Sequence, residues 1–154
     1  SISSAFNAAE KLTDLADQDA QAVSALKDEQ ERQELLALLG IREGERVSPS
    51  LRAQVRRLEE QQKRRAKRVS SDTLLRSVAQ VQTVLRDALT VALSAQAPLV
   101  NEHLREPLEA FCTRRSAQQL LEDVQAVELT LRRLRTNANA RLALEALMSR
   151  LVYQ

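Results

Sequence analysis

The residues best suited to chemistry in this sequence are its single histidine and its single cysteine. His103 and Cys112 lie nine residues apart, and that spacing matches no metal-ligand pattern. A loop histidine and a half-buried cysteine are therefore the favoured interpretation. The sequence has two glycines and contains neither G-x-x-x-x-G-K-[ST] nor G-x-G-x-x-G, so a phosphate-cradling loop is excluded. We expect no catalytic residue, no metal site and no cofactor, and hence no enzyme activity, in this chain.

A basic tract, RRLEEQQKRRAKR at residues 56–68, is the second feature with chemical potential. Its candidates for contacting phosphate groups are Lys63, Arg64, Arg65, Lys67 and Arg68. Aromatic residues for base stacking and a groove-reading motif are both absent around the tract. Charge runs are usually solvated, so a solvated or partner-facing helix surface is the favoured interpretation, with non-specific phosphate contact as the alternative.

The charge distribution offers a further explanation for this tract. Residues 1–47 carry ten acidic and five basic side chains, whereas residues 49–68 carry eight basic and two acidic ones. The acidic first helices could therefore pack beside the basic helix, so that the two charges neutralise each other within the chain.

The elements that must position these residues are predicted to be helices throughout. The chain has 154 residues, of which 44% are hydrophobic and only 2% aromatic, with two glycines and three prolines. Sandwiches and barrels of β-strands need turn residues at short intervals, and this composition lacks them. It is rich in Leu, Ala, Glu, Arg and Gln, which favour helices. We predict an all-α helical bundle with one long projecting helix, forming a single domain over 1–154.

Within that domain the first part, residues 1–47, is predicted to form looser N-terminal helices. Ser3 or Ser4 can cap a first helix to about Ala25, with Phe6, Ala9, Leu12, Ala16 and Val23 on one face. A second helix, or a continuation of the first, covers about 28–39, and Gly40 supplies its stop.

Residues 49–94 are predicted to form the long helical arm. Ser48 and Pro49 give a strong start signal, and the absence of Gly and Pro up to Ser94 allows one helix of roughly 67 Å. The apolar stripe is interrupted within the basic tract, so the first half of the arm should pack lightly and the second half should be core. Ser70 to Asp72 offer an alternative point where the helix could break.

Residues 97–154 are predicted to form the terminal helices. A loop leads into a short helix ending near Thr113, Ser116 caps the next helix, residues 136–138 turn the chain, and Asn139 caps the last helix. In this last helix Leu142, Ala143, Leu144, Ala146, Leu147, Met148 and Leu151 cover most of the circumference. We expect it to be buried on several sides, either at the centre of the bundle or between its own domain and a neighbouring subunit.

The cellular setting is inferred from cysteine usage and hydropathy. One cysteine excludes an internal disulfide and fits a reducing compartment. No apolar run approaches the roughly 18 residues that a membrane span needs, and the start lacks the apolar core of a signal peptide. We expect a cytoplasmic protein with no membrane contact. The first residue is Ser1 rather than methionine, which suggests a fragment or a processed product.

The sequence from about residue 50 to residue 154 resembles a known family, and the first 47 residues match it more loosely. APLVNEHL at 97–104 and SAQQLLEDVQAVELTLRRLRTNANARLALEALMSRL at 116–151 look like the C-terminal domain of the bacterial DNA polymerase III delta-prime subunit. NANARLALEALMSRL is the strongest part, because related clamp-loader proteins commonly end in an Asn-x-Asn-Pro-(basic)-Leu-x-Leu-Glu type of helix. Ala140 replaces the usual proline, and the upstream arm resembles the longer form of actinobacterial members.

This resemblance implies a collar domain, the part of a clamp-loader subunit that holds it in a five-subunit ring. The implied partners are the gamma/tau and delta subunits, and DNA would be met indirectly through the assembled, ATP-driven machine that loads the sliding clamp. The polar rim of the subunit interface is predicted at Arg132, Arg133, Arg141 and Glu145. Two other classes stay open: a coiled-coil adaptor that self-associates through the arm, and a nucleic-acid-binding domain that uses the basic helix.

Overall fold

The computed structural model describes residues 2–42, 46–136 and 138–153, with the side chains of residues 7–42, 46–136 and 138–152. The elements are α1 (Ile2–Leu38), α2 (Pro49–Ala92), the 3-10 helix η1 (Glu102–Leu104), α3 (Arg105–Cys112), α4 (Ala117–Arg135) and α5 (Ala140–Tyr153). The described ranges contain no strand, so the predicted all-α helical bundle is confirmed. None of their helices is both long and apolar enough to cross a membrane.

Two compact units make up the chain. Unit 1 comprises Ser1–Thr13 and Thr73–Gln154, and unit 2 comprises Asp14–Asp72. Both α1 and α2 therefore contribute residues to each unit. The expectation of one domain over residues 1–154 stays a prediction, and the two units are described separately below.

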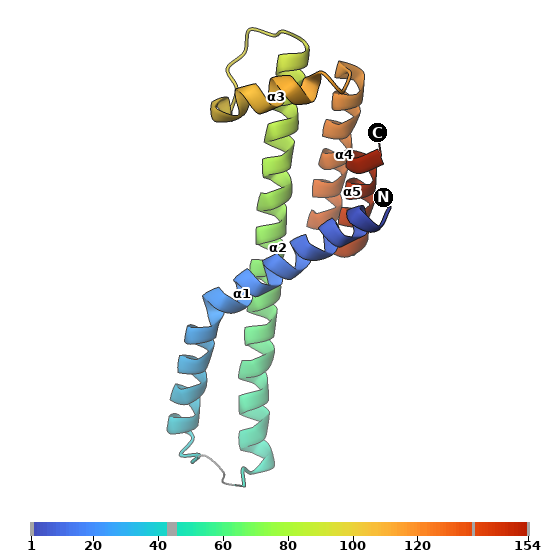
Figure 1. Ribbon diagram of the computed structural model, residues 1–154. Coiled ribbons are helices and arrows are strands. Elements are labelled where there is room, and N and C mark those ends of the chain that lie inside the picture. The colour runs from blue at the N-terminus through green and yellow to red at the C-terminus, as the bar shows by residue number, and fades with distance from the viewer. Residues whose placement is uncertain (1, 43–45, 137, 154) are drawn as a thin grey trace. The chain divides into compact units, whose positions relative to one another are not determined.

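Unit 2 is an antiparallel pair of helices joined by the loop after Leu38 (Figure 1). The first helix stops because Gly40 adopts a φ of +66°, which lets the Gly40 and Ile41 amides donate to the carbonyls of Ala37 and Leu36. The second helix starts where the Leu51 amide donates to the Ser48 hydroxyl at 3.4 Å, with Pro49 at the first helical position. Both the predicted stop and the predicted start are confirmed.

The helix pair of unit 2 packs through small side chains. Ala16, Ala20 and Ser24 of α1 are buried, which brings α1 close to α2. The prediction that Val23 shares this face is wrong, because Val23 is 74% exposed. A spacing of four residues turns the buried face by about 40° at each step, so Ser24 rather than Val23 continues it.

Three further predictions concern the long helices. α1 runs unbroken from Ile2 to Leu38, so the alternative of one continuous helix is correct. Ser3 and Ser4 lie inside this helix and do not precede it as caps, whereas the side chain of Phe6 lies outside those the structure describes. α2 also continues through Ser70 without a break, and the Ser70 hydroxyl donates to Asp17 at 2.5 Å within unit 2.

Unit 1 has a leucine and valine core. α4 and α5 lie side by side, and α3 crosses one end of α2 (Figure 1). A spacing of four and three residues in the sequence predicts an apolar face on two of these helices: Leu74, Val78, Val81, Leu85, Ala88 and Ala92 on α2, and Leu120, Val124, Val127, Leu131 and Leu134 on α4. All of them are buried except Val81, Ala92 and Leu134, which are half-buried. The sulfur of Cys112 donates to the Ala88 carbonyl at 3.2 Å and joins α3 to α2.

The last two helices begin with the predicted caps. Ser116 accepts from the Gln119 amide at 3.2 Å, and the Gln119 side chain accepts from the Ser116 amide at 2.9 Å, which completes a capping box. Asn139 accepts from the Leu142 amide at 3.2 Å and caps α5. Asn137, in the predicted turn at 136–138, lies outside the described residues.

The terminal helix is buried on one face only. Ala143, Leu144 and Leu147 are at most 4% exposed, whereas Leu142 is 62% exposed and Ala146 is also on the surface. The alternative that places this helix at the centre of its own bundle is therefore wrong, and the alternative that a neighbouring subunit covers it stays a prediction. The physical reason is that α5 packs on α4 and leaves its opposite face, with Leu142 and Ala146, exposed to solvent.

Candidate interaction surface

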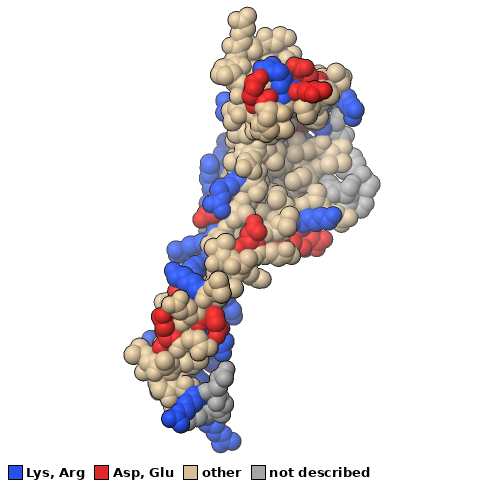
Figure 2. Space-filling view, turned by 60° about the vertical axis from the view of Figure 1, so that its left-hand side comes forward, with Lys and Arg blue, Asp and Glu red and all other residues tan. Residues whose placement is uncertain are grey.

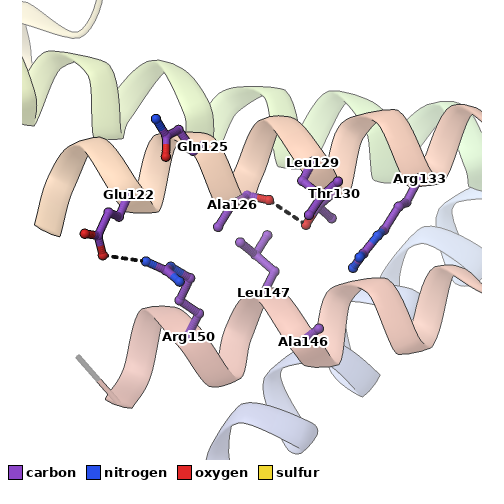
Figure 3. Close-up of a pocket in the computed structure, with 9 residues that line it drawn as sticks. All are labelled: Glu122, Gln125, Ala126, Leu129, Thr130, Arg133, Ala146, Leu147 and Arg150. Carbon is purple, nitrogen blue, oxygen red and sulfur yellow. Dashed lines mark hydrogen bonds and ion pairs between the residues drawn. The ribbon is translucent and has the colours of Figure 1, made fainter.

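A surface groove runs between α4 and α5. It has a volume of about 480 Å³, and its lining residues come from both helices: Glu122, Gln125, Ala126, Leu129, Thr130, Arg133, Ala146, Leu147 and Arg150 (Figure 3). On α4 they recur every three or four residues, which places them along one side of that helix. Small and apolar side chains of both helices lie next to each other at the surface, and they leave a groove between α4 and α5.

The groove combines an apolar floor with charged ends. Ala126, Leu129, Ala146 and Leu147 form the floor, and Leu129 is 42% exposed. At one end Arg150 donates to Glu122 at 2.9 Å, and Arg133 lies at the other end (Figure 3). The Thr130 hydroxyl donates to the Ala126 carbonyl at 2.9 Å, so it is already satisfied within α4. An apolar centre with polar groups at its rim is the usual composition of a protein contact surface.

The buried carboxylate of Asp123 holds together the two helices that line the groove. Asp123 is fully buried, and its carboxylate accepts a hydrogen bond from Arg115, which also donates to the Leu151 carbonyl at 2.6 Å. The guanidinium of Arg150 approaches Asp123 to 3.8 Å. Burial raises the pKa of Asp123, and the two arginines act in the opposite direction. Together these contacts tie the end of α5 to α4 and to the loop before it.

A second buried carboxylate holds the loop before η1. The Asp87 side chain accepts from the Val100 amide at 2.9 Å, the Asn101 amide at 2.7 Å and the Asn101 side chain at 2.8 Å. Burial by itself would raise the pKa of Asp87, but these hydrogen bonds outweigh it and the pKa is lowered. The segment APLVNEHL, singled out in the sequence, is thus anchored to α2 by its asparagine.

The predicted interface residues fall at different places on unit 1. Arg133 lines the groove, whereas Arg132 is exposed and lies outside its lining. Arg141 donates to Glu145 at 2.9 Å and lies 3.5 Å from Glu10 of α1. Arg141 and Glu145 therefore pair within α5, and Arg141 also contacts α1 within unit 1.

The groove also contains residues that the sequence analysis did not select. Glu122, Leu129 and Arg150 lie there, and none of them stood out in the sequence, because each continues an ordinary helical pattern. The sequence did contain one sign of the groove. Leu129 is apolar but lies two residues before the buried Leu131, so it belongs to another face of α4.

The candidate phosphate-contact residues lie in unit 2, and the structure places Arg65 in a different environment from the other four. Lys63, Arg64, Lys67 and Arg68 are exposed. Arg65 instead faces α1, where it pairs with Asp28 and with Glu31 at 2.7 Å. The hydrogen bonds that Glu31 accepts from Arg65 and from Gln62 lower the pKa of Glu31 to about 2. The expected neutralisation between the acidic and basic helices is thus observed for Arg65.

His103 and Cys112 do not form a common site. His103 lies on η1 and is exposed, whereas Cys112 is half-buried in α3. Burial raises the pKa of the Cys112 thiol, which favours the protonated form that donates to Ala88. Within the described ranges no group of three or more His, Cys, Asp or Glu side chains is arranged to hold a metal ion.

Comparison with known proteins gives one family. A family model described as "DNA polymerase III, delta subunit, C terminal" matches residues 66–152. No curated protein and no solved structure gives a significant match. The matched range includes all of α3 and α4 and nearly all of α5, and hence the α4–α5 groove and both buried carboxylates.

Proposed function

Because this chain belongs to the family defined by the C-terminal domain of the DNA polymerase III delta subunit, and thus has a clamp-loader-related role, we propose that it is a non-catalytic assembly domain. In this proposal it is the collar domain of a delta-prime-type subunit and holds that subunit in the ring that loads the sliding clamp. It acts in the cytoplasm and uses no cofactor. Its partners are the gamma/tau and delta subunits, and it meets DNA through the assembled complex.

The observation that carries the proposal is the α4–α5 groove within the matched range. A surface with an exposed leucine floor and charged ends is suited to receive a helix or loop of another protein. The outer stripe of α5 extends it, because Leu142, Ala146 and Arg150 follow one another at intervals of four residues. Burial of this stripe by a neighbouring protein in the ring would explain why the terminal helix is apolar on its exposed side.

The delta-prime assignment is supported by the terminal motif. Residues 139–145 follow the pattern of asparagine, basic residue and alternating leucines that the resemblance identified, and Asn139 caps the helix in the structure. The longer upstream helices are similar to the actinobacterial form. The non-catalytic role is supported by the chemistry of the side chains, because both buried carboxylates are occupied with holding backbone segments or arginines.

The experiment uses two leucines of α4 as a matched pair. Leu129 lines the groove and is 42% exposed, and Leu121 lies outside its lining and is 41% exposed. The full chain and its Leu129→Asp and Leu121→Asp variants are each mixed with the purified gamma/tau and delta subunits. Complex formation is followed by size-exclusion chromatography, and folding is checked by thermal unfolding.

We expect Leu129→Asp to weaken assembly at least tenfold, which is the effect of losing about 1.4 kcal/mol at an interface, and Leu121→Asp to assemble normally. The two variants should melt alike because both side chains are equally exposed. Assembly that is unaffected by Leu129→Asp, or weakened equally by both variants, would contradict a role for the groove. Failure of the unaltered chain to join the other subunits would contradict the collar assignment as a whole.

A further inference from the structure

The first half of α2 carries two groups of exposed basic residues on one side of the helix, one before and one after the exposed Glu59 and Glu60. Its members lie between residues 52 and 68, and all are exposed: Arg52, Arg56, Arg57, Lys63, Arg64, Lys67 and Arg68. At about 100° per residue these seven side chains occupy roughly 160° of the helix circumference over about 24 Å. Within the same sector the acidic residue is Glu60. We name these seven residues the basic face of α2.

The structure separates this face from the charges that α1 neutralises. Arg65 points to α1 and is held by Asp28 and Glu31, and Gln62 donates to the Asp28 carbonyl at 2.9 Å. Among the residues that the structure describes, no member of the basic face forms an ion pair within 4 Å. Figure 2 shows Lys and Arg side chains gathered along unit 2 on the face in view, with Asp and Glu side chains among them. Arg65 is therefore the basic residue of this tract that pairs with α1, and the seven cations of the basic face are exposed to solvent.

The residues around the basic face indicate which kind of polyanion it is suited to bind: a single strand, a membrane surface or a duplex. Residues 14–72 contain no aromatic residue, so the unit lacks the stacking platform by which single strands are usually bound. The basic face also contains no large apolar side chain, whereas a helix that lies on a membrane inserts such residues beside its basic ones. A duplex requires neither feature, because it presents about one phosphate per 1.7 Å along its axis.

We propose that the basic face of α2 binds the phosphate backbone of double-stranded nucleic acid without regard to sequence. Most of this face precedes the residues that the family model matches, 66–152, so the proposal is independent of the collar assignment. Arg65 is excluded from the binding set because its guanidinium is engaged with α1. A binding mode that uses only phosphate contacts must be strongly salt-dependent.

The test compares two variants of the full chain that have the same net charge. In the first, Lys63→Gln, Arg64→Gln, Lys67→Gln and Arg68→Gln are combined and Arg65 is retained. In the control, Arg86→Gln, Arg114→Gln, Arg132→Gln and Arg135→Gln remove four exposed cations of unit 1. Glutamine has nearly the helix propensity of lysine and arginine, so circular dichroism should be unchanged in both. Binding is measured by fluorescence anisotropy with a labelled DNA duplex of about 30 base pairs.

We expect the unaltered chain to bind the duplex and to lose about 100-fold in affinity between about 50 and 200 mM salt if four phosphates are contacted. The basic-face variant should bind at least tenfold more weakly, and the control should stay within about twofold of the unaltered chain. No duplex binding, or an equal loss in both variants, would overturn the proposal. So would stronger binding to vesicles containing phosphatidylserine, or sedimentation that shows the basic face occupied by a second copy of the chain.

Discussion

The guanidinium of Arg115 and the carboxylate of Asp123 form an ion pair in which the carboxylate is fully buried and the arginine is 10% exposed. Arg115 lies in the segment before α4 and also donates to the Leu151 carbonyl near the end of α5. A cation at the carbonyl end of a helix is favourable for the helix dipole as well. One side chain thus links the beginning of α4, its second turn and the end of the chain's last helix.

Removal of Arg115 should destabilise unit 1 strongly. In Arg115→Ala, Asp123 keeps its buried charge with only the more distant Arg150 as a partner, so we expect a loss of about 3 kcal/mol or more in the free energy of unfolding, measured by urea denaturation. Arg114→Ala, an exposed neighbour, should change it by less than about 0.5 kcal/mol. Adding Asp123→Asn to Arg115→Ala should recover part of the loss, and no recovery would mean that the buried charge is not the cause.

The capping box of α4 gives a smaller and local prediction. Ser116→Ala removes the acceptor of the Gln119 amide, so the free energy of unfolding should fall by about 1 kcal/mol in chemical denaturation. Ser71→Ala is the control, because Ser71 is an exposed residue in the middle of α2, where alanine is the better helix former. A loss of the same size in both variants would show that the cap contributes nothing.

Asp87 should make the protein sensitive to acid. Its pKa is lowered in the folded chain, so its stabilising contribution is fully present above the unfolded pKa of about 3.9 and is lost as pH falls through the lower folded value. Asp87→Ala should therefore be destabilised by about 2 kcal/mol or more at about pH 6, and the difference from the unaltered chain should narrow at about pH 3. Urea denaturation at both pH values measures this. A difference that is constant with pH would contradict the role assigned to the carboxylate.

Four of the helix ends could be predicted from the sequence because their signals are local, whereas the cap expected at Ser3 or Ser4 and the end expected near Ala25 are not observed. Gly40, Ser48, Ser116 and Asn139 each act within a few residues, and each is at the boundary it was expected to mark. The apolar repeat in α4 depends only on helical geometry, which is why four of the five residues that it predicts are buried; the fifth, Leu134, is half-buried.

The predictions that failed, and the roles that were not predicted, concern residues whose surroundings depend on which other segment packs against them. The spacing of Val23 fits a helical stripe and predicts an inward side chain, but the buried face of α1 continues from Ala16 through Ala20 to Ser24 instead. In the same way, the roles of Asp87 and Arg65 require partners 13 to 37 residues away in the sequence. No local pattern distinguishes these residues from other charged residues on a helix surface.

Two leucines of α5, two positions apart, allow the contributions of its buried face and its exposed face to be measured separately. Leu144 is fully buried and Leu142 is 62% exposed. Leu144→Ala removes buried methyl groups and leaves a cavity, so we expect the free energy of unfolding to fall by about 2 to 5 kcal/mol, whereas Leu142→Ala should change it by less than about 0.5 kcal/mol. Leu144→Asp should prevent folding, because it buries an unpaired charge. Thermal and urea unfolding of the isolated chain measure these effects. Equal losses in the two alanine variants would mean that the chain itself covers both faces of α5, and the outer stripe would then not be available to a partner.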